Sequence, residues 1–179
     1  MNKKTLIIII TAVLAVVLAA VAVFFITQKT ADKGDGNSSG NSSITSSNQV
    51  IEGGTVEIGQ VETTADNEFK IEVKIAENPG IAGYDFEFAF DNKAFSFVKC
   101  ENNLIAPLNA TETADGILAV IGVENGDVKD NGTLFTLVFK TNKDAVAGEY
   151  ELKTTKAEFA NWDEITVKSQ ISAGKITVK

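Results

Sequence analysis

The feature that most constrains the fold of this 179-residue chain is an alternation of apolar and polar residues. Between positions 69 and 75, every odd position is apolar and every even position is Lys or Glu. A similar period of two recurs at 84–90, 135–139, 149–154, 165–167 and 176–178. Because successive side chains of a strand point to opposite faces, each stretch predicts a strand with one buried face.

Residues typical of turns separate these stretches. They are Asn78-Pro79-Gly80, Asp91-Asn92, Asp115-Gly116, Asn125-Gly126, Asn131-Gly132, Ala147-Gly148 and Ala173-Gly174. No segment after residue 50 carries a sustained apolar stripe at helical spacing. The pattern predicts an all-β fold, an antiparallel β-sandwich of roughly seven to nine strands that forms one domain.

The absence of two residue types excludes several classes of function. The chain has 16 Lys and 24 acidic residues but neither His nor Arg. It therefore has no imidazole base, no His-ligated zinc and no guanidinium for binding phosphate. Residues 50–179 carry 12 Lys and 22 acids, a net charge of −10 that would repel nucleic acid. The single Cys100 permits no disulfide framework, and its expected role is that of a small apolar residue.

Residues 1–29 have the pattern of a membrane anchor. Lys3 and Lys4 precede an uncharged apolar run over 5–26, which as a helix would reach about 33 Å, roughly the thickness of a bilayer core. The positive-inside rule then predicts that the N-terminus stays inside and that the rest lies at the extracellular face of a bacterial membrane. A signal peptide cleaved after Ala22 is the alternative, and it would yield a secreted protein.

Residues 30–49 are predicted to be a flexible linker. They consist mostly of Gly, Ser and Asn, a composition that cannot bury a core. The predicted organisation is therefore an N-terminal anchor or signal over 1–29, a linker over 30–49 and a β-sandwich over 50–179.

The segment NPGIAGYDFEFAF at 78–90, followed by DNKAF, resembles the cohesin domains of bacterial cellulosome scaffoldins. Further matching motifs follow in order: Gly116-Ile117-Leu118-Ala119-Val120 leading to Glu124, Gly132-Thr133-Leu134-Phe135, Leu137-Val138-Phe139-Lys140, Gly148-Glu149-Tyr150, Phe159-Ala160 and Gly174-Lys175-Ile176-Thr177-Val178. The resemblance covers about residues 53–179.

The resemblance implies a nine-strand jelly-roll sandwich that binds a dockerin, a small helical module on a partner enzyme or scaffold. The dockerin carries the calcium, so no cofactor is expected for this chain. The contact surface would be the outer face of one sheet, with polar anchors on the strands that match 81–90 and 117–124.

Strand alternation predicts the outward residues of the first of these strands. If the aromatic residues between 84 and 88 point into the core, then Gly83, Asp85 and Glu87 lie on the outer face. The resemblance implies that Asp85 accepts hydrogen bonds from the partner helix. Cohesins often have a polar residue such as Asn where this chain has Gly83, so the dockerin class stays open.

The second candidate strand ends at Glu124, which matches the acidic anchor of the family. If Glu124 points outward, the alternation places Gly122, Val120 and Leu118 on the same face. Apolar residues beside acids would suit protein recognition. Asn125-Gly126 is predicted either to touch the partner or to form a plain hairpin turn.

Other functions have less support in the residues. Trp162 could stack on a sugar, so a carbohydrate-binding module is the alternative function, followed by a generic adhesion domain. Asp127, Asp130 and Asn131 offer oxygen ligands but lack EF-hand spacing, and no metal site is predicted. Neighbouring carboxylates on the outer face are better explained as solvated residues than as a catalytic pair. We therefore expect no catalytic residue and no small-molecule substrate.

Overall fold

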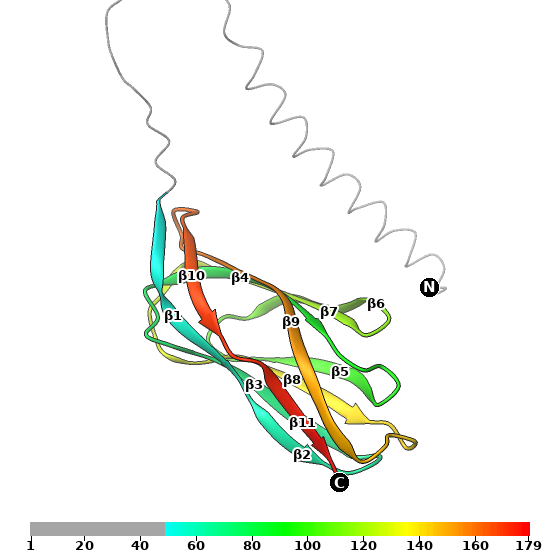
Figure 1. The fold of residues 1–179 in the computed structure, drawn as a ribbon. Helices are drawn as coiled ribbons and strands as arrows, with labels where there is room; N and C mark the ends of the chain where they lie inside the picture. Colours follow the sequence, from blue (N-terminus) through cyan, green and yellow to red (C-terminus); the bar gives the residue numbers. More distant parts are fainter. Residues whose placement is uncertain (1–48) are drawn as a thin grey trace, which may run out of the picture. The chain divides into compact units, whose positions relative to one another are not determined.

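The computed structural model describes residues 49–179 (Figure 1). The predicted anchor over 1–29 lies outside these residues, as does the predicted linker except for its last residue, Gln49. Within the described part, no helix has the length and apolar character needed to cross a membrane.

The described residues form strands, as the alternation predicts. In chain order these are β1 (Val50–Ile58), β2 (Gln60–Thr63), β3 (Glu68–Ala76), β4 (Ile81–Ala89), β5 (Phe95–Asn102), β6 (Pro107–Ala114), β7 (Ile117–Val128), β8 (Gly132–Thr141), β9 (Gly148–Ala160), β10 (Thr166–Ile171) and β11 (Gly174–Val178). The strands predicted from alternation over 69–75, 84–90, 135–139, 149–154, 165–167 and 176–178 are confirmed.

The strands form two layers that face each other across the core (Figure 1). One layer contains β5, β8 and β3, and the other contains β6, β7, β4 and β9. Rings contact one another between the layers: the Tyr84 and Phe135 centroids lie 5.0 Å apart, and those of Phe86 and Phe135 lie 5.4 Å apart. The predicted β-sandwich is confirmed.

Two parallel ladders join the layers along one side. β1 pairs in parallel with β10, and β2 pairs in parallel with β11. The prediction of antiparallel pairing throughout is therefore wrong at these two places. Alternation reports which face of a strand is buried, and it carries no information about the direction of the neighbouring strand.

Eleven strands form where about nine were expected; Gly59 separates β1 from β2, and Ser172 and Ala173 separate β10 from β11. The backbone N–H of Gly59 donates to the Glu72 carbonyl at 2.9 Å. The backbone N–H of Ser172 donates to the Val56 carbonyl at 2.9 Å. β10 and β11 both pair with β9, whereas β1 pairs with β3 and β2 pairs with β11.

Aromatic residues from both layers fill the centre of the sandwich. Phe86 is fully buried and stacks on Phe88 at 5.3 Å between centroids. It also makes edge contacts with Phe135 and Phe159, at 5.4 Å and 5.2 Å. Aromatic pairs at these separations add to the stability gained from burial. This packing fixes the pleat of β4, and with it the residues that β4 turns outward.

Candidate functional site

β4 presents the outer residues that the alternation predicts. Tyr84, Phe86 and Phe88 are 3%, 0% and 0% exposed, whereas Asp85 and its outward neighbours on β4 are partly exposed. The outward positions of Gly83, Asp85 and Glu87 are thus confirmed, while their role in partner binding stays a prediction.

β7 presents the opposite set of residues from the one predicted. Leu118 and Val120 are both 0% exposed and belong to the core. Val120 lies opposite the buried Phe86, and Ile121 lies opposite the outward Asp85. The prediction that Leu118 and Val120 form exposed contact area is wrong, and they cannot contact a partner.

The error has a physical cause near Glu124. Gly83 pairs with Val123 and Ile81 pairs with Val128, so β7 advances by five residues while β4 advances by two. Residues 124–127 therefore have no ladder partner on β4, and the alternation loses its phase there. Glu124 is exposed, as predicted, but its orientation says nothing about Leu118.

The outer face of β4 and β7 has an apolar centre. On β7 this centre consists of Ala119, Ile121 and Val123, and Val123 is 51% exposed. Where Gly83 lacks a side chain, a shallow groove of about 550 Å³ extends past Val123 to Ala160 of β9. We refer to the outward residues of β4 and β7, with residues 124–127, as the β4–β7 face.

Charged residues border this apolar centre on the side of β9. The Lys156 ammonium donates to Asp85 Oδ2 at 2.6 Å and lies 3.2 Å from Glu158 Oε2. The hydrogen bond to Asp85 raises the pKa of the Lys156 ammonium. Glu87 is engaged too, because the Thr155 hydroxyl donates to its Oε1 at 2.6 Å. The acids next to the groove therefore have intramolecular partners.

Glu124, Asn125 and Gly126 lie at one end of the β4–β7 face. Glu124 and Asn125 are exposed, and Gly126 has a φ of 120°, which side-chain-bearing residues rarely adopt. Next to them, Asp127 Oδ1 accepts a hydrogen bond from the backbone N–H of Trp162 at 2.6 Å. The Trp162 side chain is 55% exposed and lies in the turn between β9 and β10.

The three residues considered as calcium ligands each form a hydrogen bond with another part of the chain. Asp127 holds the Trp162 turn, and Asn131 Oδ1 accepts from the Asn78 backbone N–H at 3.0 Å. The carbonyl of Asp130 accepts from the Asn78 side chain at 3.0 Å. Within residues 49–179, no group of three acidic or thiol side chains is placed to hold a metal ion.

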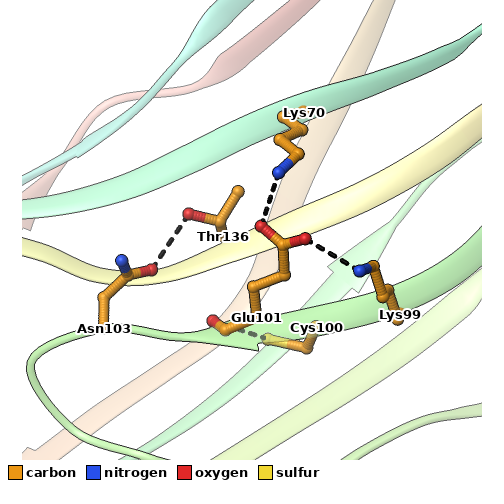
Figure 2. A network of polar contacts seen from close by, with 6 residues as sticks. All are labelled: Lys70, Lys99, Cys100, Glu101, Asn103 and Thr136. Carbon is orange, nitrogen blue, oxygen red and sulfur yellow. Dashed lines mark hydrogen bonds and ion pairs between the residues drawn. The ribbon is translucent and has the colours of Figure 1, made fainter.

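The outer face of the other layer is covered by ion pairs (Figure 2). Glu101 of β5 accepts from Lys70 of β3 at 2.7 Å and from Lys99 at 2.9 Å. These two hydrogen bonds lower the pKa of Glu101, and the bond from Lys70 has the larger effect. Beside them, the Thr136 hydroxyl donates to Asn103 Oδ1 at 3.0 Å. Lys70, Lys99 and Glu101 are therefore paired with one another within the chain.

Residues 54–178 match the family model of the cohesin domain. This chain belongs to the cohesin domain family. The resemblance that the sequence motifs indicated is confirmed over nearly the same residues. No curated protein matches this cohesin.

Solved structures share the fold at low sequence identity. The seventh ScaB type I cohesin of Pseudobacteroides cellulosolvens is 17% identical with a TM-score of 0.66, covering 72% of this chain and 94% of that one. The OlpA cohesin of Clostridium thermocellum, solved in complex with the dockerin Doc918, is 21% identical with a TM-score of 0.65, covering 71% and 99%. A non-cellulosomal cohesin of Archaeoglobus fulgidus is 15% identical with a TM-score of 0.63, covering 71% and 91%.

Sequence reasoning missed several residues of the β4–β7 face. Ile121 and Val123 were missed because both sides of β7 are apolar, so the alternation could not distinguish the inward side from the outward side. The outward placement of Gly122 is also wrong: it is buried, and an added Cβ there would lie 2.4 Å from Cζ of Tyr84. A glycine that makes room for a core aromatic ring marks the inward side of its strand. Lys156 gave no such signal, because its role depends on the register between β4 and β9.

Proposed function

We propose that this cohesin captures a dockerin-bearing protein through its β4–β7 face. The observation that carries the proposal is the apolar centre made by Ala119, Ile121 and Val123 beside the carboxylate of Asp85. Apolar surface bordered by polar groups is typical of protein recognition surfaces. The complexes that OlpA and other cohesins form with dockerins support the same class of partner.

The proposal extends to location and to the division of roles. Residues 1–29 would anchor the chain in a membrane and residues 30–49 would act as a tether, which would hold the captured protein outside the cell. The cohesin would contribute no catalysis, since cohesin domains are binding modules, and the calcium would belong to the dockerin. The partner would therefore carry the activity and this chain would set its position.

The β4–β7 face can be tested with a matched pair of double variants. Asp85→Ala with Val123→Asp changes the proposed face, and Glu72→Ala with Val98→Asp makes the same changes on the other layer, where Val98 is 44% exposed. Binding of the full-length chain to a set of calcium-loaded dockerins is measured by calorimetry. We expect the first variant to lose about thirtyfold or more in affinity, as for a hot-spot contact, and the second to lose less than about threefold.

Melting temperatures provide the control, because both variants alter exposed positions and should melt within a few degrees of the parent. Equal affinities for the two variants would show that the β4–β7 face is not the binding surface. Retention on insoluble polysaccharide, with no dockerin bound, would favour the carbohydrate-binding alternative. In that case the sugar would stack on Trp162. Among the exposed large apolar side chains of residues 49–179, Trp162 is the aromatic one.

A further inference from the structure

The described residues contain two Asn-Gly pairs in contrasting surroundings. Asn125-Gly126 lies in the segment of β7 that pairs with no residue of β4. Asn131-Gly132 begins β8, where Gly132 pairs with Ile75 of β3. The same dipeptide therefore occurs once in an unpaired segment and once in a ladder.

Few contacts restrain the Asn125 pair. Asn125 is exposed, and the hydrogen bond that it makes with a side chain runs from its own backbone N–H to Glu124 Oε1 at 3.4 Å. Within residues 49–179, no hydrogen bond engages its side-chain amide. The ladder from β6 ends at Gly122, and no heavy atom lies within 4 Å of the Cβ position of Gly126.

The Asn131 pair is held on both sides. Its side-chain Oδ1 accepts from the Asn78 backbone N–H at 3.0 Å. The side chain of Asn78 in turn donates to the carbonyls of Val128 and Asp130, at 2.9 Å and 3.0 Å. Because an ordered side chain and a paired backbone must both be released before they can react, local structure protects this pair.

We propose that Asn125 is a site of spontaneous deamidation. The backbone nitrogen of Gly126, once it loses its proton, attacks Cγ of Asn125 and forms a new C–N bond. The bond from Cγ to Nδ2 breaks, and that nitrogen leaves as ammonia. Water then opens the five-membered succinimide at either carbonyl, which gives aspartate or isoaspartate. The reaction consumes one water, releases one ammonia and needs no oxidant or enzyme.

Deamidation at Asn125 changes the charge and the backbone of the β4–β7 face. Aspartate places a third carboxylate between the exposed Glu124 and Asp127. Isoaspartate adds a methylene to the main chain in the unpaired segment. The modification itself does not depend on the proposed function, since it follows from the surroundings of the two Asn-Gly pairs alone.

The test follows both sites in one molecule. The purified full-length chain is incubated at neutral and at mildly alkaline pH, and peptide mapping by mass spectrometry measures conversion at Asn125 and Asn131. Isoaspartate is counted separately by isoaspartyl methyltransferase labelling. We expect conversion at Asn125 to be at least about tenfold faster, since the Asn131 site must first give up the hydrogen bond from Asn78 and the ladder pairing of Gly132. Both rates should rise with pH. Equal rates in the folded chain would overturn the proposal.

Two further samples identify the cause of the difference. In denaturant the two sites should convert at similar rates, and a persisting difference would show that flanking sequence, not structure, is responsible. The variant Asn78→Ala removes the restraint on Asn131 and should accelerate conversion there while leaving Asn125 unchanged. Circular dichroism confirms that this variant is folded. In Asn125→Gln, isoaspartate labelling of the folded chain should fall to the level that Asn131 contributes, and undiminished labelling would show that the site assignment is wrong.

Discussion

The Lys156 ammonium lies 2.6 Å from the Asp85 carboxylate, so the acid at the edge of the proposed binding surface is already paired within its own chain. Lys156 also reaches Glu158 at 3.2 Å, and one cation therefore serves two acids from adjacent strands. A partner that uses Asp85 must displace Lys156 or bind beside it. Both side chains are more than a third exposed, so solvent weakens the ion pair. Displacing Lys156 from Asp85 therefore costs little free energy.

Replacing Lys156 should therefore change binding more than stability. In Lys156→Met, Asp85 and Glu158 lose their cation, and we expect a basic partner to associate faster. The free energy of unfolding should change by less than about 1 kcal/mol, the usual limit for an exposed pair. Stopped-flow association at low and high salt measures the effect. Lys153→Met is the control, since it removes the same charge from the same strand. Equal rate changes in both variants would contradict a specific role for Lys156.

The close contact between Gly122 and the Tyr84 ring predicts a steric effect on stability. An alanine Cβ at this position would lie 2.4 Å from Cζ of Tyr84, whose hydroxyl donates to the Ile105 carbonyl at 3.2 Å. Gly122→Ala must push the ring aside and should cost about 1–3 kcal/mol in urea denaturation. Gly148→Ala, where nothing lies within 4 Å of the added Cβ, should stay within about 0.5 kcal/mol of the parent. If the Gly122→Ala variant were as stable as the parent, the Tyr84 ring would not pack against Gly122.

The register of β7 predicts effects of very different size on stability for two valines of this strand. Val120 is 0% exposed and Val123 is 51% exposed. Val120→Ala should therefore lower the free energy of unfolding by about 2 kcal/mol through loss of buried methyl groups. Val123→Ala should change it by no more than about 0.5 kcal/mol. If Val123 proved the more costly of the two, the strand would be out of register with β4.

The single thiol should be unreactive in the folded chain. Burial raises the pKa of Cys100 to about 12 from 9.0, and the nearby Glu101 acts in the same direction. Because the neutral thiol is favoured until the pH approaches this value, the folded chain holds about a thousandfold less thiolate than an unperturbed thiol. Alkylation by iodoacetamide at mildly alkaline pH should be slow in the folded chain and fast in denaturant. Fast labelling without denaturant would place Cys100 at the surface.

The sequence was sufficient to predict the strands whose two faces differ. In β3, charged residues alternate with the buried Phe69, Ile71 and Val73, so period and burial agree. β1, β2, β5 and β6 were not predicted from alternation; of these, β5 and β6 end the ladder order, and most of their residues are partly or fully exposed. A strand without a fully covered face has no strong alternation to detect.

The candidate site was only half predictable, for a related reason. On β4, aromatic and acidic residues differ enough to identify the outward side, and Asp85 was placed correctly. On β7, both sides are apolar, and the phase was taken from Glu124 across an unpaired segment that alternation cannot reveal. The partnership of Lys156 with Asp85 depends on pairing between distant strands, which no local pattern contains.

The parallel pairing of β1 with β10 has a mechanical consequence. β1 is the first strand of the sandwich, and it lies between β10 and β3 with ladder bonds to both. A pull applied to the chain before Val50 acts along the axis of β1, so these hydrogen bonds bear the load together in shear and do not open one after another. Pulling β1 out of the sandwich would therefore require breaking its hydrogen bonds to β10 and β3 at the same time.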